Sequence, residues 1–223
     1  MKLAQSRIFL SLIIVFISGI FLCSRVLFAE GYKKDSVRAV NDNDIATLRV
    51  LVTNPTSANI RDSEGRTLLM SAAWCGYLKI AEYLLENGAD INARKANGIT
   101  ALMLAARNCH ADMVRYLLDN GAYVNAQTNN GKTALMYAAE RGYIFVLEAL
   151  VEKNADVNMK DKKGRTALMF TAIGGDTDSA KFLIGKGADI NVKDNTGKTA
   201  LMLAINNRHA SIARLLKAVG AKE

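Results

Sequence analysis

Few residues of this chain have the types and spacing that catalysis or metal binding would need. The sequence has two histidines, His110 and His209, and neither belongs to a serine–histidine–aspartate set of the kind used in nucleophilic catalysis. The sequence contains no phosphate-binding loop and no cysteine–histidine cluster with metal-ligand spacing, and the pair Gly174-Gly175 is typical of a helix end. We therefore expect no enzyme, no metal and no cofactor.

The dominant feature of the sequence is an internal repeat, which would position these residues. A threonine followed by two apolar residues and methionine recurs at a constant step of 33 residues, and the block Gly-Ala-Asp-Ile-Asn at 88–92 keeps that step. His110 and His209 share one repeat position, so they would lie roughly 30 Å apart at about 10 Å per repeat, and we expect both to be structural. The recurring threonines are Thr67, Thr100, Thr133, Thr166 and Thr199.

Each repeat predicts two short helices and a polar hairpin. Thr67 can accept a hydrogen bond from a free amide at a helix start, so we expect a helix over 68–74 that Gly76 ends. Apolar residues at helical spacing predict a second helix over 78–86, and the polar stretch 89–98 predicts a hairpin loop. Helices of about two turns do not persist alone, so the units must stack. We expect apolar packing for the repeated methionines, namely Met70, Met103, Met136, Met169 and Met202.

The repeat resembles the ankyrin repeat, on its 33-residue length, its threonine-x-leucine helix start, its double alanine and its Gly-Ala-Asp-Ile-Asn turn. The resemblance implies an all-α solenoid of about six stacked helix-turn-helix units over residues 33–221. Half of the residues are apolar and 22% are charged, which fits a globular protein rather than a disordered one. The units are an N-terminal cap of two helices at about 34–66, repeats at 67–99, 100–132, 133–165 and 166–198, and a C-terminal cap at 199–221.

Residues 1–29 have the pattern of a signal peptide, with basic residues before the apolar run 8–22. We expect cleavage after Ala29; an uncleaved membrane anchor and lipidation at Cys23 are the alternatives. All three place the repeats outside the cytoplasm, in the periplasm or secreted, or anchored at the inner membrane, and the expected host is a bacterium. Without residues 1–29, 26 basic and 21 acidic residues leave a formal charge of +5, which alone does not indicate nucleic acid.

The family binds partners through its hairpin tips and the concave face of its first helices, so the resemblance implies a non-catalytic scaffold or adaptor for another protein. A membrane-anchored recruiter and an antidote or protective chaperone for one exported protein are the alternatives. Basic hairpin residues favour an acidic partner, although they also fit ordinary solvated loop charges. We expect a monomer and no nucleic-acid partner. The candidate partner-binding residues are Trp74, Tyr77, Arg107, Arg141 and Tyr143 near the helices, and Arg66, Arg94, Lys95, Lys132, Lys160, Lys162, Lys163, Arg165 and Lys198 in the hairpins.

Two further expectations concern single repeat positions. Cys75 and Cys109 lie in successive repeats, offset by one position, so a disulfide is one alternative and two free thiols are the other. A second position, four residues after the repeated threonine, carries a large side chain in four of the repeats; this side chain could face a partner, but core packing is the simpler interpretation. The residues at that position are Leu104, Tyr137, Phe170 and Leu203.

Overall fold

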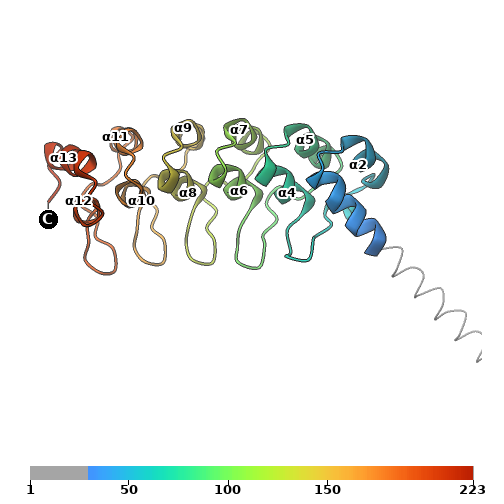
Figure 1. The fold of residues 1–223 in the computed structure, drawn as a ribbon, viewed down its shortest axis with the longest axis horizontal. Coiled ribbons are helices and arrows are strands. Elements are labelled where there is room, and N and C mark those ends of the chain that lie inside the picture. Colours follow the sequence, from blue (N-terminus) through green and yellow to red (C-terminus); the bar gives the residue numbers. More distant parts are fainter. Residues whose placement is uncertain (1–29, 223) are drawn as a thin grey trace, which may run out of the picture.

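The computed structural model describes residues 30–222 as one row of stacked helix pairs with hairpin loops along one side (Figure 1). Among these residues there are six pairs, as the repeat predicts. The first pair consists of a helix that covers residues 30–41 and α2 (Ile45–Leu51). The other pairs are α4 (Leu68–Cys75) with α5 (Leu78–Glu86), α6 (Ala101–Arg107) with α7 (Ala111–Asp119), α8 (Ala134–Arg141) with α9 (Ile144–Glu152), α10 (Ala167–Gly174) with α11 (Thr177–Gly185), and α12 (Ala200–Asn206) with α13 (Ala210–Ala218).

The first helix of each repeat begins at the predicted threonine. Thr67 accepts a hydrogen bond from the backbone N–H of Met70, three residues later, and Thr100, Thr133 and Thr199 do the same in their repeats. These bonds satisfy one of the amides that a helix start leaves free. Thr166 is the exception, because its buried hydroxyl has no hydrogen-bond partner among the described residues.

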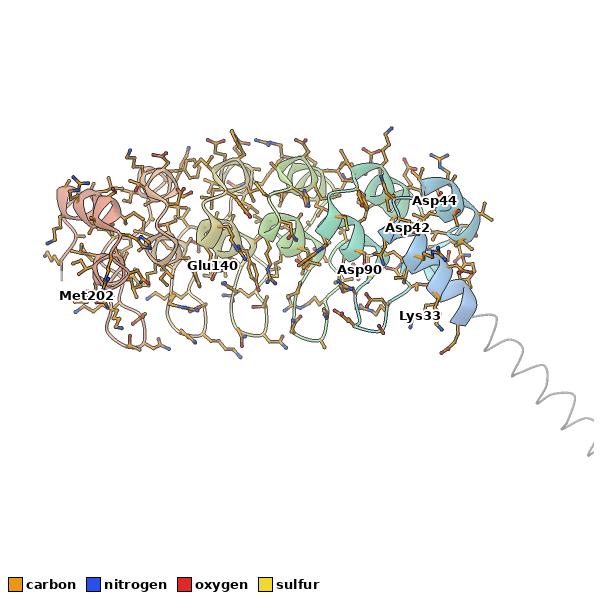
Figure 2. The ribbon with its side chains drawn as sticks, viewed as in Figure 1. Lys33, Asp42, Asp44, Asp90, Glu140 and Met202 are labelled. Atoms are coloured by element: carbon orange, nitrogen blue, oxygen red, sulfur yellow. The ribbon has the colours of Figure 1, made fainter. Side chains whose placement is uncertain are left out.

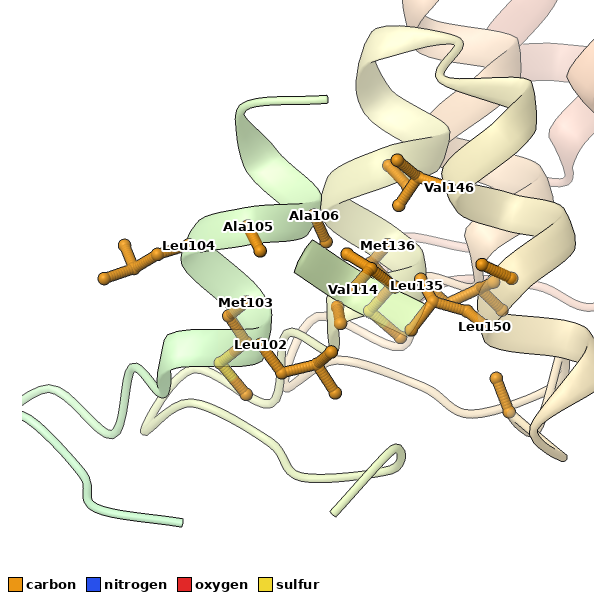
Figure 3. Close-up of a cluster of buried hydrophobic side chains, with 14 of the residues drawn as sticks. Leu102, Met103, Leu104, Ala105, Ala106, Val114, Leu135, Met136, Val146 and Leu150 are labelled. Atoms are coloured by element: carbon orange, nitrogen blue, oxygen red, sulfur yellow. The ribbon is translucent and has the colours of Figure 1, made fainter. Parts of the chain in front are cut away.

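The core is made of alanine, leucine and methionine side chains between neighbouring first helices. Figure 3 shows Leu102 and Met103 of α6 with Leu135 and Met136 of α8, all of them fully buried. The paired alanines, such as Ala105 and Ala106, carry side chains small enough for adjacent helices to pack closely. Apolar packing is thereby confirmed for the methionines at 70, 103, 136 and 169, whereas Met202 is only half-buried because it lies in the last repeat.

Hydrogen bonds outside the helices also join each repeat to the next. The turn asparagine Asn158 accepts from the backbone N–H of Asp189 at 2.8 Å and donates to the carbonyl of Gly187 at 3.1 Å. Asn59, Asn92 and Asn125 make the same two contacts one repeat apart. The hairpins are linked in the same way, for example by the backbone N–H of Lys162 and the carbonyl of Asn130, 2.9 Å apart. The row is therefore held by polar contacts at its turns as well as by its apolar core.

The N-terminal cap differs from the prediction of two helices. The cap contains a third helix, α3 (Pro55–Ala58), after α2. Asn54 accepts from the backbone N–H of Ser57, the Ser57 hydroxyl accepts from the Asn54 N–H, and Pro55 fits a first helical position. The cap's first helix also includes residues 30–32, ahead of the predicted boundary at 33. The predicted signal peptide, residues 1–29, lies outside the described residues. Within residues 30–222, no helix is both long and apolar enough to cross a membrane.

Candidate functional site

Both histidines are structural contacts between repeats, as predicted. The His110 Nε2 atom lies 3.0 Å from the carbonyl oxygen of Trp74, and the His209 Nε2 atom lies 3.0 Å from that of Ile173. Each ring therefore hydrogen-bonds the end of the first helix in the preceding repeat. In the part of the chain that the structure describes, no group of three histidine, cysteine or acidic residues could hold a metal ion.

Cys75 and Cys109 are free thiols in the structure. Cys75 is the last residue of α4 and is half-buried, whereas Cys109 is exposed in the turn before α7. Cys109 has a φ of +65°, at a position where other repeats carry glycine. Of the two alternatives for these cysteines, a disulfide or two free thiols, the structure has the two free thiols.

A row of alternating aromatic and cationic side chains runs along four first helices and their hairpins. The Arg107 guanidinium of α6 lies 5.8 Å from the ring centre of Trp74 on α4 and 5.9 Å from that of Tyr137 on α8. The ammonium of Lys132 lies 4.6 Å from the Tyr137 ring. These distances allow cation–π attraction, which orients the long basic side chains across the surface.

The row continues at Phe170 of α10. Lys132 Nζ lies 4.5 Å from the Phe170 ring centre, and the Arg165 guanidinium lies 4.6 Å from it. We call these six residues the aromatic–cation row: Trp74, Arg107, Tyr137, Lys132, Phe170 and Arg165. Four of the six were predicted to bind a partner, and the structure brings them together with the two aromatic residues that were expected to pack in the core.

An open pocket of about 530 Å³ lies at the centre of this row. Its lining comprises Arg107, Lys132, Tyr137, Glu140 and Arg141. The Lys132 ammonium donates to Glu140 Oε2 at 2.6 Å, so one of the three cations has a carboxylate partner inside the pocket. Figure 2 shows Glu140 on α8, in the row of helices next to the hairpins. Burial raises the pKa of the Tyr137 hydroxyl. The nearby Arg107 charge lowers this pKa and the Glu140 charge raises it, and the net effect is an increase. Tyr137 is therefore a neutral phenol.

Tyr137 and Glu140 are the pocket residues that the sequence prediction left out. Core packing is confirmed for Leu104, Phe170 and Leu203, which are 5%, 1% and 8% exposed at the same repeat position. Tyr137 is only half-buried, because the basic side chains beside it leave part of its ring open to the pocket. The sequence did contain a signal for Tyr137: of the four large side chains at this repeat position, the other three are leucine or phenylalanine, and only Tyr137 has a polar group.

Tyr77 and Tyr143 lie at the junctions between the two helices of their repeats. Each is the residue before a second helix, α5 or α9, and each is half-buried against the apolar core. Neither belongs to the aromatic–cation row or lines its pocket. The aromatic residues of the row that reach the surface are therefore Trp74 and Tyr137.

Several of the predicted hairpin cations are bound within the chain. Arg66 lies 2.8 Å from Asp62, Lys95 lies 3.2 Å from Glu64, and Arg165 lies 2.8 Å from Asp161. Arg94 donates to the backbone carbonyl of Gln127 in the next hairpin. Of the predicted hairpin cations, four are exposed and have neither an ion pair nor a side-chain hydrogen bond within the described residues: Lys160, Lys162, Lys163 and Lys198.

Hairpin aspartates form two of these ion pairs, those of Arg66 and Arg165. Asp62 accepts hydrogen bonds from the backbone N–H groups of Glu64 and Arg66 and from the Arg66 side chain. Burial opposes ionisation of Asp62, but these bonds and the Arg66 charge outweigh it and hold the pKa of Asp62 below 3.8. Asp161 and Asp194 make the same backbone contacts in their hairpins. The signal in the sequence was an aspartate three residues before the hairpin glycine in three of the five hairpins, at Asp62, Asp161 and Asp194.

Comparison with protein families agrees with this architecture. A family model described as ankyrin repeats in three copies matches residues 92–161 and 154–222, and one described as ankyrin repeats in many copies matches residues 51–102. The chain belongs to the ankyrin repeat family. Members of this family are typically non-catalytic modules for protein–protein interaction. No curated protein matched the chain.

Proposed function

We propose that this protein is a non-catalytic scaffold that binds a partner protein along the aromatic–cation row. The row itself carries the proposal, because it places the single tryptophan, 39% exposed, beside exposed arginines and an open pocket. Tryptophan and arginine are the residues most enriched among those that dominate binding energy at protein interfaces. The exposed hairpin lysines extend this surface and favour a partner with acidic groups.

The place of action that we propose is outside the cytoplasm, in the periplasm or secreted. The support is the basic start and apolar run of residues 1–29. N-terminal sequencing of the mature protein separates cleavage after Ala29 from an uncleaved inner-membrane anchor. Recovery of the intact protein in the cytoplasmic fraction would contradict both forms of export.

Crosslinking in the native envelope, followed by mass spectrometry, tests the scaffold proposal. We expect one or a few partner proteins to crosslink to the wild-type chain, and we expect Trp74→Ala to lose them while its melting temperature stays within a few degrees. Phe145→Ala is the matched control, because Phe145 is 66% exposed on the second helix α9 and lies outside the row. If Trp74→Ala remains folded and keeps its crosslinks, the row is not the binding surface. A large loss of stability would instead mark Trp74 as a core residue.

A further inference from the structure

The pocket in the aromatic–cation row has more positive charge than the chain neutralises. Arg107, Lys132 and Arg141 line it together with one carboxylate, that of Glu140. Glu140 pairs with Lys132 at 2.6 Å. Among the described residues, neither Arg107 nor Arg141 lies within 4 Å of a carboxylate, and both are exposed. The pocket therefore presents two arginines to an anion that comes from outside the chain.

The geometry of Arg107 suits it to bind a carboxylate. Its guanidinium lies between the rings of Trp74 and Tyr137, at 5.8 and 5.9 Å from their centres. A guanidinium held by ring contacts keeps N–H groups at its edge, and these can donate two parallel hydrogen bonds to one carboxylate. Preorganisation by the two rings reduces the side-chain entropy that such binding costs.

The length of the row identifies the source of the carboxylate. Its solvent-accessible part runs from Trp74 on α4 past Arg107 on α6 to the hairpin residue Arg165, so the surface spans three repeats, well beyond the pocket itself. Phe170 of α10 is buried beneath the cations at the end of the row. An extended polypeptide can follow such a row, whereas a small acid would fill only its centre. Resting on the scaffold function proposed above, we propose that this pocket binds an aspartate or glutamate side chain in an acidic segment of the partner protein, held by Arg107 and Arg141.

The experiment measures binding of a fluorescently labelled peptide of alternating glutamate and serine by anisotropy, at low and high salt. The same peptide with glutamine in place of glutamate is the probe control. We expect saturable binding of the acidic peptide alone, weakened by salt, with a change in Trp74 emission because Trp74 contacts Arg107. Arg107→Gln and Arg141→Gln should each weaken binding about three- to tenfold, as for loss of one partly exposed charge contact.

Two further variants make the test specific to the pocket. Glu140→Gln removes the internal carboxylate and frees Lys132, so it should tighten binding about two- to fivefold. The double variant Lys79→Gln/Lys186→Gln removes two exposed charges at the second helices, outside both the pocket and the hairpins, and should change binding less than twofold. Circular dichroism confirms that each variant remains folded.

Three outcomes would overturn the inference. The first is equal binding of the glutamine peptide, and the second is a loss of binding in Lys79→Gln/Lys186→Gln but not in Arg107→Gln or Arg141→Gln. The third is displacement of the acidic peptide by free glutarate, or by a short single-stranded oligonucleotide, at lower concentration than by unlabelled peptide. Each of these leaves the scaffold proposal standing if Trp74→Ala still loses its crosslinked partner, so the two proposals can fail separately.

Discussion

The imidazole of His110 packs directly over Gly76 of the preceding repeat. A β-carbon added to Gly76 would lie 2.6 Å from His110 Nδ1, while Nε2 of the same ring lies 3.0 Å from the carbonyl of Trp74. His209 and Gly175 repeat this arrangement, with a β-carbon distance of 2.7 Å from the ring. The histidine of one repeat thus requires glycine at the helix end of the repeat before it.

Gly76→Ala should destabilise the protein by roughly 2–3 kcal/mol, from the strain of φ +76° and from the clash with His110. Gly197→Ala is the matched control, because Gly197 has φ +79° but nothing within 4 Å of an added β-carbon. Its loss should be about 1 kcal/mol. Urea unfolding measures both. Equal losses in the two variants would show that His110 moves aside without cost.

Arg208→Gly should stabilise the protein by about 0.5–1 kcal/mol. Arg208 has φ +61° at the repeat position where Gly76, Gly142 and Gly175 stand, so a β-carbon there is strained. Arg214→Gly within α13 should instead cost about 1 kcal/mol, because it places glycine inside a helix. The urea midpoints of the two variants should therefore shift in opposite directions. A loss in both would mean that the Arg208 side chain contributes more than its backbone costs.

Asn158→Ala should cost about 1–3 kcal/mol, because it removes one hydrogen bond to the Asp189 N–H and one to the Gly187 carbonyl. Asn130→Ala in a hairpin serves as the control, since no side-chain hydrogen bond of Asn130 occurs among the described residues; its effect should stay within about 0.5 kcal/mol. The melting temperatures measure the difference. Similar values for the two variants would show that the turn asparagines do not stabilise the stack.

Stability should fall in acid partly through Asp62. Its pKa in the folded chain lies below 3.8, so its contribution is present above pH 3.8 and is lost as the pH falls through the lower folded value. Asp62→Asn should therefore be less stable than the wild type at neutral pH, and the difference should shrink in acid. Urea midpoints across this pH range measure it. A difference that stays constant with pH would show that ionisation of Asp62 does not stabilise the fold.

Thiol labelling without reductant should give two equivalents per chain after unfolding, if Cys23 is removed with residues 1–29. In the folded protein Cys109 should react faster than Cys75, because Cys109 is exposed and Cys75 is half-buried at the end of α4. Cys109→Ser should remove the fast phase. Labelling that appears only after reduction would instead establish a disulfide.

Much of the fold could be predicted because its signals are local. Thr67 caps its helix three residues away, and Gly76 ends the same helix with a positive φ, so the predicted and observed helices agree to within one residue. The short helix α3, which Asn54 and Ser57 start, was not part of the predicted two-helix cap. Their reciprocal hydrogen bonds are also local, but the same residue types favour turns and helix starts alike.

The candidate site depended on contacts between repeats. The sequence identified Trp74 and Arg107 as surface residues and placed them in successive repeats, since a 33-residue period determines which face a residue occupies. It did not show that Arg107 lies between Trp74 and Tyr137, or that Lys132 binds Glu140. Those contacts are set by the rotamers of long basic side chains after the helices have stacked. Periodicity therefore decided the architecture, and only the packing of neighbouring repeats decided which residues of that face form one pocket.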